Sequence, residues 1–420
     1  MSATFHHDVA CTACGCVCDD LTVTVEGNRI TRAERACKIA EPWLLSQNTH
    51  QPAATWCDGQ PVEHEAALER AVAILNQARS PLIYGLSRST TEGQRAAVAL
   101  AERIGATIDT TAATGHAPSL MALQQVGEST CSLGEVKNRA DLVIYWASDP
   151  LTTHPRHLER YSVEPRGLYT PRGRADRFLV VVGPEENETS KIADLFIKIE
   201  PDGDWEALWT LRALVRGVEL ANVPEPLRQL AARMKACRCG IVFFGAGLTH
   251  THLPHRQVEA LLQLVTDLNA HTRFYARRMR RLGDVAGADS VLTWQTGYPF
   301  AVNFALGYPR YNPGEWSAPD MLARGEVDAC LFVGSETSAE FPPAALEHLR
   351  CIPVIVLESP ETTTAFPVAV RFTTAVYGIH RPGTAYRMDE IPIPLRMLLE
   401  TDYPSDGEIL SQLLSRIDRE

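Results

Sequence analysis

The sequence predicts an α/β protein with a multi-lobed, mainly parallel sheet fold. Short, continuously apolar segments recur along the chain, and such runs are typical of strands that are covered on both faces. Segments with apolar residues at helical spacing lie between them. Each half of the chain also repeats the order strand, glycine-rich turn, helix and strand. Because strands that alternate with helices form βαβ units with right-handed crossovers, these observations favour parallel sheets.

The expected elements follow in chain order. An alternating strand at 21–25 is followed by a turn at 26–29, and an amphipathic helix is expected within 60–80. The buried strands are then expected at 81–85, 142–146, 178–182, 240–244, 329–333 and 353–357. The further helices are expected at 91–104, with Gly105 as C-cap, 205–218, 256–270 and 407–417, the last on an exposed end of the chain.

The length of the chain, 420 residues, allows two or three domains. We expect a small cysteine-rich module at 1–55 and a first α/β lobe at 56–235, part of which is allowed to cross between the lobes. A second α/β lobe with a C-terminal tail is expected at 236–420. No repeat with a period of about 20–50 residues is visible, which disfavours a short-period solenoid.

The composition disfavours several functional classes. The net charge of −11 argues against nucleic-acid binding, because a phosphate backbone attracts surfaces rich in Lys and Arg. No apolar run reaches the roughly 18–20 residues of a membrane span, and the first residues lack the basic and apolar regions of a secretory signal. Eleven cysteines, an odd number, argue against a disulfide framework and for a reducing compartment. We therefore predict a cytoplasmic protein without nucleic-acid or membrane partners.

The N-terminal cysteines are spaced as ligands of a metal centre. Cys11, Cys14 and Cys18 share one short segment, and Cys37 follows at a distance. Three thiolates on one loop and one from elsewhere can hold a [4Fe-4S] cluster. Zinc also takes four thiolates and stays open as the alternative, although zinc sites usually combine two separate C-x2-C pairs. Cys16 is the expected spare cysteine.

The segment CTACGCVCDD at 11–20 resembles the N-terminus of the B-type subunit of formylmethanofuran dehydrogenase, in the molybdopterin oxidoreductase superfamily. This resemblance implies a molybdopterin-oxidoreductase-like fold, a tungsten or molybdenum held by two pterins, and a [4Fe-4S] cluster. Further segments resemble motifs of that family in the same order: 109–119, 141–150 with 154–157, 293–302, 307–315 and 378–389.

Two departures from the family pattern concern the pterin-bound metal. In the metal-ligand segment the family has Cys or selenocysteine before a His, whereas this chain has Gly115 before His116. Glycine has no side chain that can bind a metal, and a thiolate donor helps to set the redox potential of such a site. After the strand at 178–182, the family's Asp-Pro-Arg or Asp-Val-Arg turn is replaced by Gly-Pro-Glu-Glu at 183–186. The sequence therefore predicts that a molybdenum or tungsten pterin is absent.

These departures point to one bacterial branch of the family. The chain most resembles the B-type subunit of the formyltransferase/hydrolase complex of methylotrophs, which converts formyl-tetrahydromethanopterin to formate through a methanofuran-type carrier. The resemblance implies a non-redox, scaffolding subunit whose partners are an amidohydrolase-like hydrolase subunit, a formyltransferase subunit and a small β-rich subunit. Two alternatives stay open: an active molybdenum or tungsten formylmethanofuran dehydrogenase subunit, and an iron–sulfur electron-transfer subunit.

The resemblance implies candidate residues for a vestigial pocket and for carrier binding. Gly115, His116 and Arg280 correspond to the family's active pocket. The basic run Arg277, Arg278, Arg280 and Arg281 is a candidate contact for the carrier's anionic groups, with a solvated or interface loop as the alternative. For the segment 245–247, Gly-Ala-Gly, we favour a tight structural turn over a phosphate-binding loop.

Overall fold

The computed structural model describes residues 3–249 and 252–417. The chain forms two compact units, and each is described by itself. The first unit contains residues 1–114 and 282–420, and the second contains residues 115–281. The chain therefore passes from one unit to the other twice, directly before Gly115 and directly after Arg281. No helix in the described part of the chain is long and apolar enough to cross a membrane.

The first unit begins with the predicted cysteine-rich module. Its antiparallel sheet contains β1 (Thr4–Val9), β2 (Leu21–Glu26) and β3 (Arg29–Glu34), and α1 (Ala40–Ser46) follows. The cysteine segment 11–18 connects β1 to β2, so that the module holds it between two paired strands.

The main sheet of the first unit is parallel in its centre. There β7, β6, β15, β16 and β17 lie side by side, and their side chains are almost all buried, as continuous apolar runs predict. The full order is β14 (Arg310–Tyr311), β13 (Val302–Asn303), β7 (Thr107–Thr110), β6 (Pro81–Gly85), β15 (Ala329–Val333), β16 (Val354–Glu358), β17 (Val370–Thr373), β4 (Thr55–Cys57) and β5 (Gln60–Pro61).

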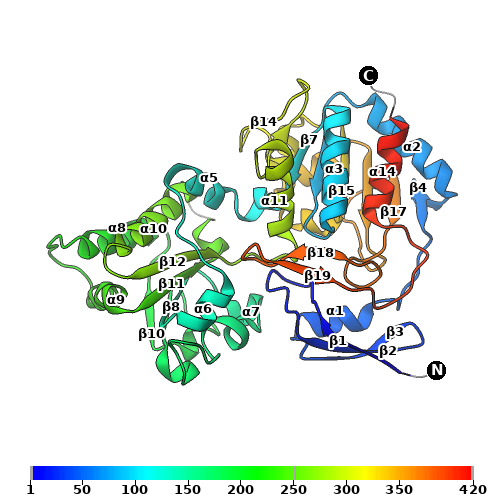
Figure 1. Cartoon of the computed structure of the whole chain (residues 1–420). Coiled ribbons are helices and arrows are strands. Elements are labelled where there is room, and N and C mark those ends of the chain that lie inside the picture. Colours follow the sequence, from blue (N-terminus) through cyan, green and yellow to red (C-terminus); the bar gives the residue numbers. More distant parts are fainter. Residues whose placement is uncertain (1–2, 250–251, 418–420) are drawn as a thin grey trace. The chain divides into compact units, whose positions relative to one another are not determined.

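Helices of the first unit pack their apolar faces against this sheet. Helix α3 ends at Gly105, whose positive φ of 66° is the left-handed C-cap that the sequence predicts. The last helix lies beside α3 (Figure 1) and buries Ile409, Leu410 and Leu413 in the same core, so the prediction of an exposed end was wrong. The helices are α2 (His64–Gln77), α3 (Thr91–Ile104), α4 (Ala112–Gly115), α11 (Val285–Thr296), α12 (Ala318–Ala323), α13 (Pro343–Leu349) and α14 (Asp406–Arg416); a hairpin of β18 (Gly383–Tyr386) and β19 (Pro392–Leu395) completes the unit.

The second unit is built on a fully parallel sheet. Its order is β10 (Leu195–Lys198), β9 (Phe178–Gly183), β8 (Leu142–Trp146), β11 (Cys239–Phe244) and β12 (Arg273–Arg278). The helices of this unit are α5 (Ala117–Val126), α6 (Leu133–Arg139), α7 (Pro150–Thr153), α8 (Asp204–Val215), α9 (Glu225–Ala236) and α10 (Pro254–Leu268).

The predicted α/β class with parallel sheets is confirmed, but the two units do not follow the predicted halves 56–235 and 236–420. Strand β15 from the second half pairs with β6 from the first, and β11 from the second half pairs with β8 from the first. A buried strand pairs with a strand that helps to cover both of its apolar faces. The residues of the strand itself do not determine where along the chain that second strand lies. The structure therefore interleaves segments that the sequence suggested as successive lobes.

Candidate functional site

The cysteine loop, residues Cys11–Cys18, is closed by its own backbone. The amide of Cys11 donates to the carbonyl of Cys18 at 2.8 Å, and the amide of Val17 donates to the carbonyl of Cys14 at 3.1 Å. Val17 has a positive φ of 36°, which is costly for a β-branched residue and indicates a tightly determined turn. The cysteines of this loop are buried, and Cys37, between β3 and α1, is partly exposed.

Electrostatic coupling shows that the predicted cysteines lie near one another. Burial raises the pKa of Cys11, and the neighbouring Cys14, Cys18 and Cys37 thiolates raise it further by repulsion. A hydrogen bond with Cys16 lowers the pKa of Cys14, and the positive charge of Arg88 lowers it further. Cys14, Cys18 and Cys37 therefore lie close enough to Cys11 to affect its charge, and the role of the four cysteines as cluster ligands stays a prediction. The structure does not set Cys16 apart, because Cys16 shares side-chain hydrogen bonds with Cys14 and Cys18.

The arrangement of the cysteines bears on which metal centre they fit. Within residues 3–249 and 252–417, no three His, Cys, Asp or Glu side chains are placed to hold a metal ion. A cubane cluster spreads its four thiolates further apart than a single zinc ion does, since its iron atoms occupy separate corners. The choice of a cluster over zinc stays a prediction of the cysteine spacing.

Arg88 is a residue beside the loop that the sequence patterns did not single out. It follows strand β6, and its guanidinium donates to the carbonyl of Thr12 at 3.0 Å. From another side, the amide of Met388 donates to the carbonyl of Gly15 at 2.9 Å. Gly283 packs so closely that a Cβ there would lie 2.3 Å from the Thr12 carbonyl oxygen. A polar residue three positions after a buried strand was the only sequence signal for Arg88, and it is a common one.

Gly115 has room for a side chain among the described residues. A Cβ at this position would have no heavy atom of residues 3–249 or 252–417 within 4 Å. The carbonyl of Gly115 accepts a hydrogen bond from the Thr249 hydroxyl at 3.1 Å. His116 follows at the N-terminus of α5 and is buried, with 7% of its surface exposed. Residue 115 thus has a backbone hydrogen bond and room for a side chain, but glycine has no side-chain atom that can bind a metal.

Asp109, at the end of β7, anchors the start of the same segment within the first unit. Its carboxylate accepts hydrogen bonds from the amides of Thr110 at 2.9 Å, Ala301 at 2.9 Å and Ala318 at 2.6 Å. Burial raises the pKa of Asp109 to about 7, although these hydrogen bonds oppose the rise. The sequence motif contained this residue, but only the structure shows that it connects three separate segments.

Of the predicted basic residues, Arg277, Arg278 and Arg280 are buried in the second unit, and Arg281 is exposed. The guanidinium of Arg277 donates to Thr130 at 3.1 Å, and Arg278 forms an ion pair with Glu128 at 2.9 Å. The carbonyl of Arg280 pairs with His154 at 2.7 Å. Much of this run is therefore engaged within its own unit, and carrier binding by these residues stays a prediction.

The Gly-Ala-Gly turn after β11 is structural, as the sequence predicted. A Cβ on Gly245 would lie 2.7 Å from the carbonyl oxygen of Ala147, and one on Gly247 would lie 3.0 Å from the Cβ of Ala147. Both glycines therefore allow the chain after β11 to pass close to the chain after β8. This close passage accounts for the glycines without a phosphate ligand.

Comparison with known proteins places the chain in a family. No protein-family model matches it. The B-type subunit of the tungsten-containing formylmethanofuran dehydrogenase 2 of Methanocaldococcus jannaschii, however, is 42% identical over 98% of both chains. The chain belongs to the family of B-type formylmethanofuran dehydrogenase subunits. The protein of the same description from Methanococcus maripaludis is 38% identical over 98% of both chains.

A third relative is the B-type subunit of the formyltransferase/hydrolase complex Fhc of Methylorubrum extorquens. It is 27% identical over 67% of this chain and 75% of its own. The predicted family is therefore confirmed. The narrower prediction, a likeness above all to the formyltransferase/hydrolase subunit, is not favoured, because the two tungsten-containing relatives match more of the chain at higher identity.

Solved structures confirm the predicted fold. A chain of the formyltransferase/hydrolase complex from Methylorubrum extorquens with methylofuran superposes with a TM-score of 0.73 and 24% identity, covering 87% of this chain and 98% of that one. Acetylene hydratase from Pelobacter acetylenicus superposes with a TM-score of 0.68 and 12% identity, covering 98% of this chain and 69% of that one. At these identities the likeness concerns the fold of the family and not its chemistry.

Proposed function

We propose that this chain is the B-type subunit of a formylmethanofuran dehydrogenase-type complex and that it takes part in oxidising the formyl group of a methanofuran-type carrier. The observation that supports the proposal is the similarity to tungsten-containing subunits over 98% of the chain. Its partners would be the other subunits of such a complex.

The cysteine loop fits the iron–sulfur part of this function. Cys11, Cys14, Cys18 and Cys37 would hold a [4Fe-4S] cluster, which supplies one-electron transfer when it is bound. A hydrogen bond with Cys16, together with the charge of Arg88, lowers the pKa of Cys14 and favours its thiolate form, whereas burial raises the pKa of Cys11. Burial of the loop limits access of water to the sulfur atoms.

Residue 115 does not fit a metal that requires a side-chain ligand. Gly115 offers no donor atom, and the space around it is open. A tungsten or molybdenum in this subunit would therefore have no side-chain ligand from residue 115.

A second candidate function rests on the same residue. Without a ligand at 115, the chain would serve as a non-redox, scaffolding subunit in a formyltransferase/hydrolase complex, with a hydrolase, a formyltransferase and a small β-rich subunit as partners. The turn after β9 supports this candidate, since Glu185 and Glu186 are exposed there and would repel the phosphates of a pterin nucleotide. The absence of a molybdenum or tungsten pterin is a prediction of this candidate.

Purification of the complex from its native host separates the two functions. We would measure tungsten, molybdenum, iron and extractable pterin per chain, and assay oxidation of the formyl carrier with an artificial electron acceptor. Stoichiometric tungsten or molybdenum with acceptor reduction is the expected result. A complex that holds no tungsten or molybdenum, reduces no acceptor and still releases formate by hydrolysis would reject the dehydrogenase and support the second candidate.

A further inference from the structure

The second unit has an open groove at the amino ends of β8, β9 and β11. Its volume is about 420 Å³, and it lies between the loop before β9 and the C-terminal end of α9. Ligand sites of open parallel sheets usually lie at the carboxyl ends of the strands. The groove is therefore at the opposite edge from the turns after β8, β9 and β11. The cysteine loop, Asp109, Gly115 and the basic run 277–281 do not line it.

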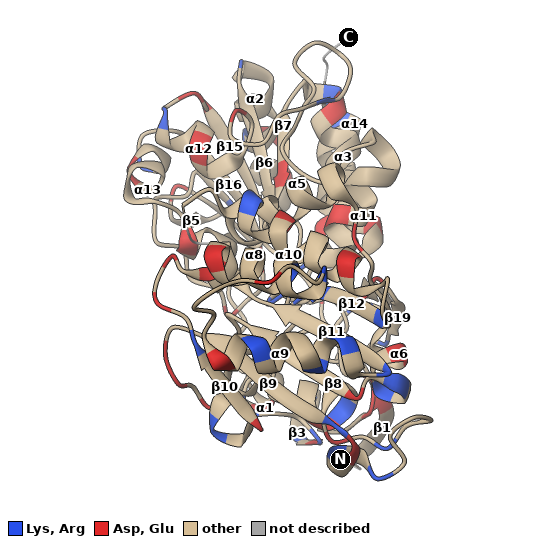
Figure 2. Ribbon diagram, turned by 90° about the vertical axis from the view of Figure 1, so that its left-hand side faces the viewer, with Lys and Arg blue, Asp and Glu red and all other residues tan. Residues whose placement is uncertain are grey.

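Positive charge dominates this groove. Arg172, Arg177, Arg233 and Arg238 line it together with Asp141 and Asp176, which leaves a net charge of +2 on a chain whose net charge is −11. Figure 2 shows further basic positions along α9, whose last turn contains Arg233 and Lys235. We name this feature the arginine groove.

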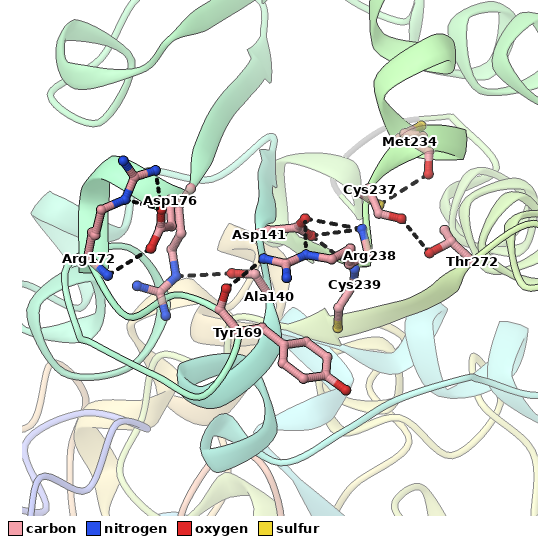
Figure 3. Close-up of polar contacts among 11 residues, drawn as sticks. Ala140, Asp141, Tyr169, Arg172, Asp176, Met234, Cys237, Arg238, Cys239 and Thr272 are labelled. Atoms are coloured by element: carbon pink, nitrogen blue, oxygen red, sulfur yellow. Dashed lines mark hydrogen bonds and ion pairs between the residues drawn. The ribbon is translucent and has the colours of Figure 1, made fainter.

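The two aspartates of the arginine groove are already engaged by local partners (Figure 3). Asp141 accepts hydrogen bonds from the amides of Arg238 at 3.1 Å and Cys239 at 2.9 Å. Asp176 accepts from the amide of Arg172 at 2.7 Å and from its guanidinium at 2.6 Å. Both carboxylates thus stabilise the backbone at the rim, and neither of them contacts Arg233.

Arg233 keeps its charge available for a ligand. It is exposed, its guanidinium lies 3.6 Å from the centre of the Phe178 ring, and no carboxylate pairs with it in the described part of the chain. The other arginines have partners: Arg172 pairs with Asp176, and Arg238 lies 3.5 Å from a carboxylate oxygen of Asp141. Arg177 is buried and donates to backbone carbonyls. Arg238 donates to the carbonyl of Tyr169 at 2.6 Å and lies 5.4 Å from the centre of that ring. Contacts with aromatic rings reduce the entropy that a guanidinium loses when it binds a carboxylate.

We propose that the arginine groove docks an acidic segment of a partner protein. Arginine binds carboxylates in a bidentate manner, so that Asp and Glu side chains of an extended segment match Arg233 and Arg238. The groove is open and polar, whereas small-molecule sites are concave and mainly apolar. Leu168, 69% exposed and next to Tyr169, adds an apolar contact of the kind that accompanies arginine and tyrosine at protein interfaces.

The proposal is tested on the purified full-length chain with a fluorescently labelled hexaglutamate peptide as the probe. Binding is followed by fluorescence anisotropy in low salt and in high salt. We expect saturable binding that weakens with salt, and a loss of about tenfold in affinity for Arg233→Glu and for Arg238→Glu, because each reversal places a like charge in the groove. Arg216→Glu, an exposed arginine at the end of α8, is the matched control and should bind as the unaltered chain does.

Arg233→Glu is the decisive variant, since Arg233 is exposed and, in the described part of the chain, its guanidinium contacts only the Phe178 ring. Equal affinity of this variant and the unaltered chain would overturn the proposal, and so would an equal loss in Arg216→Glu. Complete displacement of the peptide by millimolar inorganic phosphate would also overturn it in favour of a small-anion site. None of these results depends on the reaction that the complex performs, so failure here is distinct from failure of the proposed function.

Discussion

The cysteine loop and residue 115 differ in what their surroundings require of the side chain. The loop is held from several sides, by its own closing hydrogen bond, by Arg88 and by the amide of Met388, and its cysteines are buried. Gly115 keeps one hydrogen bond through its carbonyl and has open space where a side chain would lie. A chain of this family can therefore lose the donor at residue 115 without disturbing its fold, whereas loss of a loop cysteine affects a packed structure.

The largest expected effect is on the loop. Cys11→Ser should reduce the iron content of the anaerobically purified protein from roughly four atoms per chain to well below one, because a cubane cluster depends on all four thiolates. The melting temperature should fall together with the iron content, since bound metal stabilises the folded state.

The exposed Cys351→Ser is the control for that measurement and should change neither quantity. Unchanged iron content in Cys11→Ser would show that this residue is not a cluster ligand. In that case the comparison between the loop and residue 115 would concern packing alone.

A smaller but still large effect is expected at Asp109. Asp109→Ala leaves three buried backbone amides without their acceptor, so the free energy of unfolding should fall by about 3–5 kcal/mol in urea denaturation. The exposed Asp402→Ala should stay within about 0.5 kcal/mol of the unaltered chain. A similarly small change in Asp109→Ala would mean that the start of the metal-ligand segment is not anchored by this carboxylate.

The pH dependence of stability follows from two buried carboxylates of the first unit, Asp109 and Asp284, the residue directly before α11. Burial raises the pKa of Asp109 to about 7 and that of Asp284 to about 8, from an ordinary value of 3.8. The folded state then binds more protons than the unfolded state between about pH 4 and 8. The stabilisation that comes from these raised pKa values is therefore complete at low pH and is lost as the pH rises. The free energy of unfolding should therefore be lower at pH 8 than at pH 5. Urea denaturation at both values checks this, and an increase with pH would contradict it.

The smallest effect is expected at residue 115 itself. Gly115→Cys should change the free energy of unfolding by less than about 0.5 kcal/mol, because its Cβ meets no atom within 4 Å. The matched substitution Gly245→Ala brings a Cβ to 2.7 Å from the Ala147 carbonyl oxygen and should cost about 1–3 kcal/mol. Equal costs for the two variants would show that the space at residue 115 is not available to a side chain. Metal analysis of Gly115→Cys then tests whether a restored thiol increases tungsten or molybdenum retention.

Local patterns in the sequence determined several elements of this protein. The strand Pro81–Gly85 and the helix Thr91–Ile104 with its Gly105 cap follow from short-range apolar periodicity and from the need for a positive φ. The cysteine spacing and the Gly at 115 are likewise visible without a structure, since ligand types are a property of the residues themselves.

Other features were decided only by the tertiary structure. The pairing of β6 with β15 and of β8 with β11, which interleaves the two halves of the chain, depends on contacts between residues far apart in sequence. The burial of α14 on α3, the contact of Arg88 with the cysteine loop and the three amides around Asp109 have the same origin. Apolar periodicity indicates which face of an element must be buried. Which segment of the chain covers that face is decided by the free energy of folding of the whole chain.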